Sequence, residues 1–141
     1  MFAETDTDID RCYEVMRELR THLSREDFLS QVRRQMRDSG FRLLYLRDDQ
    51  EIQAIAGIRV AEWLARGKSL DVEDLVTTAS SRSKGFGSQL FDQIVEIAKE
   101  EDCTEIRLVS HVTRFDAHRF YLRKGMRIDA HFFSMPITEK Q

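Results

Sequence analysis

Cysteine, proline and long apolar runs are scarce in this sequence, and the scarcity of each excludes a class of protein. The two cysteines, Cys12 and Cys103, are too few for a disulfide framework or a zinc site. No apolar run approaches the roughly 20 residues that span a bilayer, so no membrane is expected as a partner. The acidic start, Met1 to Asp10, has no apolar core like that of a signal peptide. We expect a cytoplasmic protein with small, reduced core cysteines, a reactive thiol being the alternative.

A large excess of positive or negative charge is lacking as well. The sequence holds 22 lysines and arginines against 25 aspartates and glutamates, which gives a formal net charge of −3. So small an excess exerts no general attraction on nucleic acid, and none is expected as a partner. The four histidines show no metal-ligand spacing, and no metal is predicted.

The sequence also shows no sign of a boundary between two domains. There is one proline, Pro136, and no linker rich in serine and glycine, no low-complexity tract and no repeat. A chain of 141 residues that is 41% hydrophobic fits one globular core. We therefore expect a single domain over residues 1–141.

Hydrophobic periodicity predicts the order of helices and strands. Apolar residues at helical spacing predict a helix over 9–23, capped by Thr7, and a second helix that begins after Ser24 and stops at Gly40. Alternation then predicts strands over 41–46, 52–60 and 69–77. A β-α-β pattern follows, with a helix over 88–101, a strand over 106–109, a helix over 114–124 and a last strand or two over 126–136. The predicted class is α/β (α+β), with a mixed, mostly antiparallel sheet of six or seven strands and about four helices.

The segment that indicates chemistry lies between the third strand and the helix after it. Its sequence is Arg82-Ser83-Lys84-Gly85-Phe86-Gly87. Glycine adopts backbone angles that are closed to other residues, so successive N–H groups can converge on one anion. The following helix adds its dipole and its unpaired first-turn donors, which together make a phosphate cradle. On this pattern alone, a plain tight turn from strand to helix fits equally well.

Two segments resemble a known family. Residues 72–77, VEDLVT, followed by this glycine segment and an amphipathic helix, resemble motif A of the GNAT superfamily of N-acetyltransferases. Residues 117–126, AHRFYLRKGM, are similar to motif B, in which a tyrosine on a short helix precedes a basic residue and a glycine. Both segments stand in the family's order and spacing, and the predicted elements follow the GNAT arrangement over nearly the whole chain.

The resemblance implies how acetyl-CoA would bind. The pantetheine arm would lie between two parting strands and pair with the backbone of Leu75, Val76 and Thr77. The pyrophosphate would lie on the loop, whose cofactor-binding residues would be Arg82, Ser83, Lys84, Gly85, Phe86, Gly87 and Ser88. Arg114 departs from the pattern, because the family often has an asparagine there that contacts the cofactor. This arginine could reach a CoA phosphate, reach the acceptor, or be solvated.

The resemblance also implies direct transfer of an acetyl group to a primary amine. Tyr121 is the expected acid for the leaving thiolate, since a phenol is protonated at neutral pH; the alternative is a core residue of the last helix. For the base we choose Glu73 first and Asp71 second, which share one strand face by the period-two rule, with Asp74 on the other. The alternative is that these carboxylates only flank the strand.

The sequence does not identify the acceptor of the acetyl group. A small amine, an aminoglycoside, an amino acid, a polyamine and a peptide or protein amine all fit the sequence. His131 and the segment 20–22 lie where the family builds its acceptor pocket. The alternative function is a non-catalytic acyl-CoA-binding or regulatory module that keeps the cradle without turnover. Pairing through edge strands would give a homodimer, and a homodimer is therefore one expected state of the protein.

Overall fold

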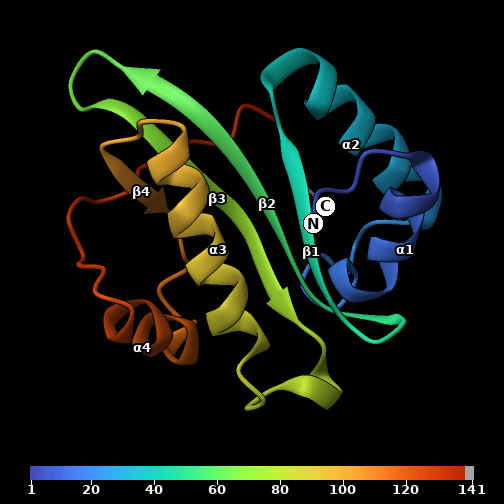
Figure 1. The fold of residues 1–141 in the computed structure, drawn as a ribbon. Helices are drawn as coiled ribbons and strands as arrows, with labels where there is room; N and C mark the ends of the chain where they lie inside the picture. The colour runs from blue at the N-terminus through green and yellow to red at the C-terminus, as the bar shows by residue number, and fades with distance from the viewer. Residues whose placement is uncertain (139–141) are drawn as a thin grey trace. The chain divides into compact units, whose positions relative to one another are not determined.

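The structure is a computed structural model that describes residues 1–138. It forms two compact units, Met1–Leu108 and a second that begins at Val109. The first holds α1 (Asp6–Met16), α2 (Arg25–Ser39), β1 (Arg42–Asp48), β2 (Glu51–Trp63), β3 (Gly67–Thr77), the 3₁₀ helix η1 (Ala79–Ser81), α3 (Phe86–Glu100) and β4 (Glu105–Leu108), and the second holds α4 (Phe115–Arg123) (Figure 1). No helix in the described range combines the length and the hydropathy needed to cross a membrane.

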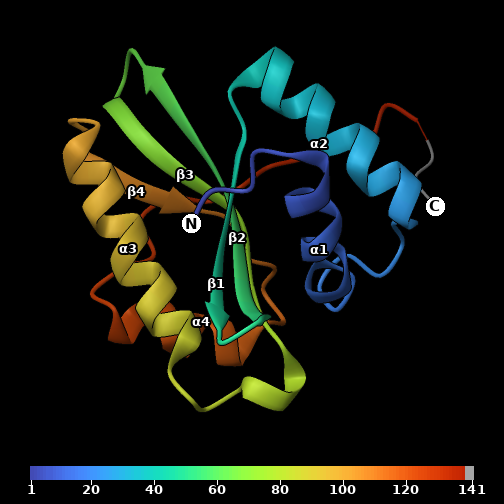
Figure 2. The same cartoon turned by 45° about the vertical axis from the view of Figure 1, so that its right-hand side comes forward.

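The first unit is a sheet with helices on both faces. Its strand order is β1-β2-β3-β4, antiparallel from β1 to β3 and parallel between β3 and β4. The helices α1 and α2 cover one face and α3 covers the other (Figure 2). This mixed α/β arrangement confirms the predicted fold class.

Burial on both faces explains the unbroken apolar run from Leu43 to Leu46 in β1. Leu43 and Tyr45 pack on the core under α1 and α2, whereas Leu44 packs on the core under α3. In β2, Ile55 faces the first core and Ile58 the second. Full burial of one such aliphatic side chain contributes roughly 1.5–3 kcal/mol to the free energy of folding. Exposing either face of the sheet would therefore strongly destabilise the protein.

The first helix differs from its prediction at both ends. Its cap is Thr5 and not Thr7: Thr5 Oγ1 accepts from Asp8 N at 3.1 Å, and Asp8 Oδ2 accepts from Thr5 N at 3.3 Å. This capping box satisfies two backbone donors at once. The helix ends at Met16, although Leu19 and Leu23 beyond it pack on the same core and so continue the apolar spacing.

The second helix begins and ends as predicted. Ser24 Oγ accepts from Asp27 N at 3.1 Å, and Gly40 ends the helix in the left-handed conformation with φ +71°. A residue with a Cβ would be strained there.

The predicted strand count is wrong. The described sheet has four strands, not six or seven, and residues 126–138 form no strand. Apolar side chains of this segment, among them Ile128, Phe133 and Ile137, are more than 80% exposed. Alternation of apolar residues indicates a strand only where a neighbouring strand accepts its backbone hydrogen bonds, and the sequence pattern carries no information about that neighbour.

Replacing Thr5 with alanine should lower the free energy of unfolding by about 1 kcal/mol, because it leaves the N–H of Asp8 without its acceptor. Thr7→Ala is the matched control: Thr7 lies exposed inside α1, where alanine is the better helix former, so no loss of stability is expected. Urea denaturation of both variants measures the difference. Equal losses, or a larger loss for Thr7→Ala, would contradict the assigned cap.

Candidate functional site

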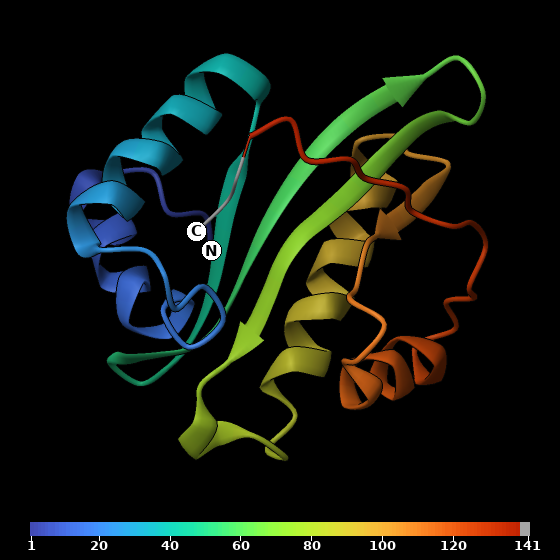
Figure 3. The same cartoon turned by 180° about the vertical axis from the view of Figure 1, so that it is seen from behind.

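The outer edge of β3 is open over half of its length. Within the first unit, β4 pairs with β3 only over Ser69–Val72. From Glu73 to Thr77 the strand has β2 as its neighbour on one side, and β3 runs on past the end of β4 (Figure 3). Unpaired backbone N–H and C=O groups along a strand edge are ready to pair with another extended chain. The predicted pantetheine contacts, Leu75 to Thr77, lie on this edge.

The loop after β3 has the backbone conformation that an anion cradle needs. Ser83 and Gly85 both have positive φ, +75° and +84°, and α3 begins at Phe86 with no side-chain cap on its first turn. Alternating left- and right-handed residues turn successive N–H groups toward one point. A Cβ on Gly87 would lie 3.0 Å from Thr77 Oγ1, so glycine lets the first turn of α3 approach the end of β3. The edge of β3 and the first turn of α3 therefore lie next to each other.

Two residues that the sequence did not single out hold this loop. Glu18 Oε1 accepts from Ala79 N at 2.9 Å and lies 3.9 Å from Arg82 Nη2. Gln53 Oε1, on β2, accepts from the hydroxyl of the buried Ser81. Neither residue is near the loop in the sequence, and no local pattern marks them. Arg82 and Lys84 are exposed beside the loop, in reach of solvent anions.

A β-bulge changes the face on which the acidic residues of β3 lie. In the pairing with β2, Val72 lies opposite Ile58 and Asp74 lies opposite Gly57, so Glu73 is the extra residue. A bulge shifts the alternation of faces by one. The expectation that Asp74 lies on the other face from Asp71 and Glu73 is therefore wrong.

The contacts confirm that the acidic residues share the face of α1 and α2. Leu70 and Val72 pack on the core under α3, and Asp71 points the other way. Past the bulge, Val76 packs on the core under α1 and α2, and Asp74 lies beside Phe41 of that core. Each carboxylate has an arginine partner: Asp71 with Arg107 at 2.9 Å, Glu73 with Arg59 at 3.1 Å and Asp74 with Arg20 at 2.9 Å.

The surroundings of Glu73 change its proton affinity. Burial raises its pKa above the ordinary value of 4.5, Arg59 opposes the rise, and the neighbouring Asp74 and Asp71 add to it. Asp71, in contrast, is engaged by both Arg107 Nε and Nη2, at 3.0 and 2.9 Å. A raised pKa makes a carboxylate a stronger base near neutral pH. The geometry thus favours Glu73 over Asp71 for that role.

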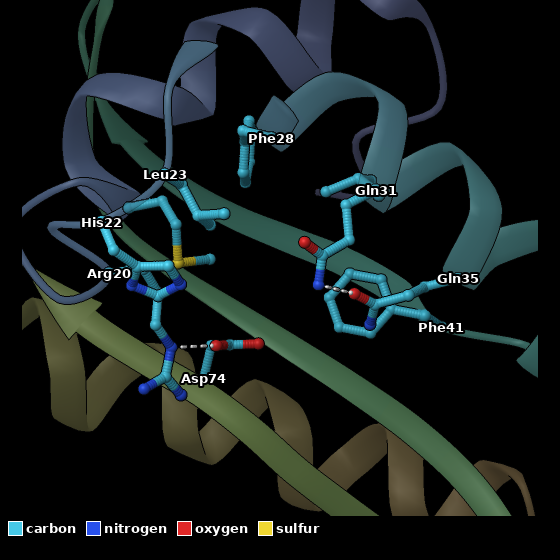
Figure 4. Close-up of a pocket in the computed structure, with 10 residues that line it drawn as sticks. Arg20, His22, Leu23, Phe28, Gln31, Gln35, Phe41 and Asp74 are labelled. Carbon is cyan, nitrogen blue, oxygen red and sulfur yellow. Dashed lines mark hydrogen bonds and ion pairs between the residues drawn. The ribbon is translucent and has the colours of Figure 1, made fainter. Parts of the chain in front are cut away.

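A pocket of about 240 Å³ opens between α1, α2 and the sheet. Figure 4 shows the polar groups that enter it: the Arg20–Asp74 pair, His22, and the side chains of Gln31 and Gln35, which are joined by a hydrogen bond of 3.0 Å. The remaining lining is apolar and consists of Met16, Leu23, Phe28, Val32 and Phe41. Arg20 and His22 of the segment 20–22 therefore line a pocket, and that this pocket takes the acceptor stays a prediction.

Gly57 forms part of the support for this pocket. A Cβ there would lie 2.4 Å from Asp74 Oδ2 and 2.5 Å from Phe41 Cζ, closer than atoms can pack. Only glycine at this position leaves room for the Asp74 carboxylate beside the aromatic ring. An isolated glycine inside a strand pattern is also the sequence signal for a bulge, and it is the signal by which Asp74 could have been found.

The second unit holds the predicted acid. Arg114 stands immediately before α4, and Tyr121 lies on that helix, half-buried, with its ring centroid 5.6 Å from that of Phe120. Burial raises the pKa of the Tyr121 phenol, with Arg114 opposing the rise. The phenol is therefore protonated at neutral pH, as a proton donor must be. In the same unit His118 Nε2 lies 2.9 Å from His111 O, and His131 lies beside Phe133.

The cysteines are not placed for covalent catalysis. Cys12, on the buried face of α1, is fully buried, and burial raises the pKa of its thiol to about 12. Cys103 packs against the core under α3, and burial raises its pKa as well. Cys12 is thus a core residue as predicted, Cys103 lies at the margin of a core, and the reduced state of both stays a prediction.

Comparison with known proteins identifies the family. Residues 5–126 match the model of the Acetyltransferase (GNAT) family. The chain belongs to this family. It is 35% identical over 126 residues to the uncharacterized N-acetyltransferase YhdJ of Bacillus subtilis (strain 168), covering 89% of each chain. It is 33% identical over 72 residues to an aminoalkylphosphonate N-acetyltransferase of Salmonella typhimurium, covering 51% of this chain and 43% of that one.

Solved structures confirm the GNAT fold. A crystal structure described as a transcriptional regulator from Bacillus halodurans C-125 superposes with a TM-score of 0.84 at 22% identity, covering 96% of this chain and 97% of the other. Together the family match and the relatives identify this GNAT protein as an N-acetyltransferase, which confirms the predicted enzyme class.

The raised pKa of Glu73 predicts how stability depends on pH. Because the folded protein binds this proton more tightly than the unfolded chain, the stabilisation is complete below pH 4.5 and is lost as the pH rises through the raised pKa. Glu73→Gln has no such proton. Its free energy of unfolding relative to the wild type should therefore increase between about pH 4 and pH 7.

Urea denaturation of the wild type and of Glu73→Gln across this range measures the difference. Glu100→Gln, at the exposed end of α3, controls for the change in net charge. A relative stability of Glu73→Gln that falls with rising pH would show that the carboxylate is stabilised in its charged form.

Proposed function

We propose that this GNAT protein transfers the acetyl group of acetyl-CoA directly to the primary amine of a small molecule, with its two units acting as one domain over residues 1–141. The observation that carries the proposal is the open edge of β3 leading into the left-handed turn at Ser83–Gly85 and the uncapped start of α3. An extended chain that ends in a diphosphate needs this sequence of partners: strand edge first, anion cradle second.

The residues that would hold acetyl-CoA follow from that order. The backbone of Leu75, Val76 and Thr77 would pair with the amides of the pantetheine arm. The pyrophosphate would accept from the N–H groups between Ser83 and Ser88, with the exposed side chains of Arg82 and Lys84 adding positive charge. Arg114, ahead of α4, would reach a CoA phosphate, reach the acceptor, or be solvated.

The transfer asks three things of the protein. A lysine-like ammonium is mostly charged at pH 7, a cost of roughly 4–5 kcal/mol for the reactive amine, and Glu73 with its raised pKa accepts that proton directly or through water. As nitrogen bonds to the acetyl carbon, the N–H of Val76 or its neighbour donates to the acetyl oxygen. As the C–S bond breaks, Tyr121 protonates the departing thiolate. The products are an N-acetyl amide and CoA.

Relatives support a small acceptor. The Salmonella relative carries aminoalkylphosphonate in its name, a small molecule with a primary amine. The pocket beside Asp74 is of matching scale.

The alternative, a non-catalytic acyl-CoA-binding module, needs the loop but not a carboxylate with a raised pKa beside the open edge. Release of CoA in the presence of an amine separates the two. A peptide acceptor, a homodimer and a cytoplasmic location stay predictions.

Acetyl-CoA should bind the folded protein, and Gly85→Ala should weaken that binding by about 5- to 30-fold, because a left-handed residue with a Cβ costs about 1–2 kcal/mol. Gly40→Ala is the matched control: it too is a left-handed glycine with nothing within 4 Å, but it ends α2. Calorimetry should show unchanged affinity for Gly40→Ala. No binding by the folded wild type, or equal weakening by both variants, would refute the cradle.

Tyr121→Phe should lower kcat by about one to three orders of magnitude while leaving the affinity for acetyl-CoA nearly unchanged, because only proton donation to the thiolate is lost. Tyr45→Phe removes the hydroxyl of a tyrosine buried in the first core and should leave kcat unchanged. The assay is spectrophotometric release of CoA at saturating acetyl-CoA. Full turnover by Tyr121→Phe would remove this residue from the mechanism.

A further inference from the structure

The pocket beside Asp74 carries two opposite charges held side by side. Arg20 Nε donates to Asp74 Oδ1 at 2.9 Å, and Arg20 Nη2 donates to Glu73 O at 2.9 Å. These bonds leave the Nη1 group of the same guanidinium, whose side chain is 40% exposed, to other acceptors. Asp74 Oδ2 lies over Gly57, beside the Phe41 ring. The pair thus offers donors on one side and a carboxylate oxygen on the other.

The rest of the lining adds no further fixed charge. Besides Arg20 and Asp74, the lining residues are His22, two glutamines and five apolar side chains. Gln31 Nε2 donates to Gln35 Oε1, so the two amides satisfy each other in part and keep Gln31 Oε1 as an acceptor and the remaining N–H groups as donors. A ligand that matches this lining has one positive group, one negative group and an apolar part.

The volume limits the ligand to a small molecule. At about 240 Å³ the pocket holds the volume of roughly eight waters. It is smaller than the usual range of roughly 300–1,000 Å³ for pockets that bury drug-sized ligands. The apolar side chains of Phe28, Val32 and Phe41 give room for a group of the size of one aliphatic or aromatic side chain.

We infer that the acceptor is a small amino acid-like molecule, with a primary amine, an acid group and an apolar substituent. This inference rests on the proposed acetyl transfer. The ammonium binds Asp74 Oδ2, the acid group accepts from Arg20 Nη1 with the exposed His22 beside it, and the apolar substituent packs on Phe28 and Phe41. Asp74 directly precedes Leu75, so the amine is held next to the strand edge that would carry the thioester.

Charge matching explains which amines the pocket rejects. A diamine brings a second cation toward Arg20, which is repulsive at this distance. An amine without an acid group leaves the donors of Arg20 without the anion that they fit, and sites built on such pairs discriminate strongly against analogues that lack the partner. Because Arg20 is partly exposed, we expect discrimination of about 10- to 100-fold and not the largest values known.

The transfer balances with this acceptor. The ammonium loses one proton to Glu73, the nitrogen forms a bond to the acetyl carbon, and the C–S bond breaks. The thiolate takes one proton, and the amide nitrogen releases its second. An N-acetylated acid, CoA and one net proton leave the site.

The acceptor panel is tested on the wild-type protein by release of CoA. The acid-bearing amines are L-leucine and 1-amino-3-methylbutylphosphonate, which distinguish a carboxylate from a phosphonate. The controls are leucinamide and isoamylamine, which keep the apolar group without the acid, and putrescine, a diamine. We expect at least one acid-bearing amine to exceed every control in kcat/KM by about 10-fold or more. Equal or better turnover of isoamylamine or putrescine would overturn the inference.

The outcomes separate this inference from the proposed function. If acetyl-CoA binds but no member of the panel releases CoA, the acceptor class is wrong and the cofactor site stands. If the folded protein does not bind acetyl-CoA, the proposed function fails and the inference falls with it.

Arg20→Gln tests the residue itself. We expect the ratio of kcat/KM for the preferred acid-bearing amine to that for isoamylamine to fall by about 10-fold or more, so that the preference is lost. Arg17→Gln is the matched control, since Arg17 is exposed and pairs only with Glu14 among the described residues. A purely structural Arg20 would lower both values alike, and that result would overturn the inference. The wild-type panel decides the matter even where Arg20→Gln does not fold.

Discussion

The arrangement of this GNAT site depends on one backbone irregularity, the bulge at Glu73 in β3. Pairing with β4 ends at Val72, the residue immediately before it, so the bulge also marks where the outer edge of β3 becomes free. Up to that point Leu70 and Val72 pack under α3, and past it Val76 packs under α1 and α2. Without the extra residue Asp74 would point into the apolar core under α3, where an unpaired charge is very costly. One inserted residue therefore directs the carboxylate into the pocket at the point where the pairing with β4 ends.

Much of the fold could be predicted because its signals are local. Ser24 and Gly40 bound α2 through the residue types that satisfy helix ends, and the loop at Gly85 adopts the left-handed conformation for which glycine is suited. Thr5 was missed for a related reason. Both Thr5 and Thr7 have an aspartate three residues later, and only the backbone conformation shows which threonine completes the capping box. Local patterns thus narrow the position of a helix start to a few residues without deciding it.

What could not be predicted depends on partners far away in the sequence. Glu18 supports the loop from 61 residues away, and Arg20 reaches Asp74 across 54. The face of Asp74 was predicted wrongly because alternation assumes an uninterrupted strand, although Gly57 opposite it carried a hint of the bulge. The strands expected over 126–136 were predicted wrongly because they too depend on a distant partner, and here that partner is absent from the described sheet. Their apolar alternation is real, but a strand exists only where another backbone pairs with it.

The bulge also allows two neighbouring carboxylates to take different tasks. In a regular strand, consecutive side chains point to opposite faces, so adjacent acidic residues cannot serve one site. Here Glu73 and Asp74 lie on the same face with Arg59 and Arg20 as separate partners, and Asp74 adds to the rise in the pKa of Glu73. Asp74 is joined to Arg20 through Oδ1 at the pocket wall, and its Oδ2 is suited to bind a cation. Glu73, whose burial outweighs its arginine, is suited to take up a proton. A residue pair that binds the ammonium and then removes its proton needs this difference, and the bulge supplies it without a second strand.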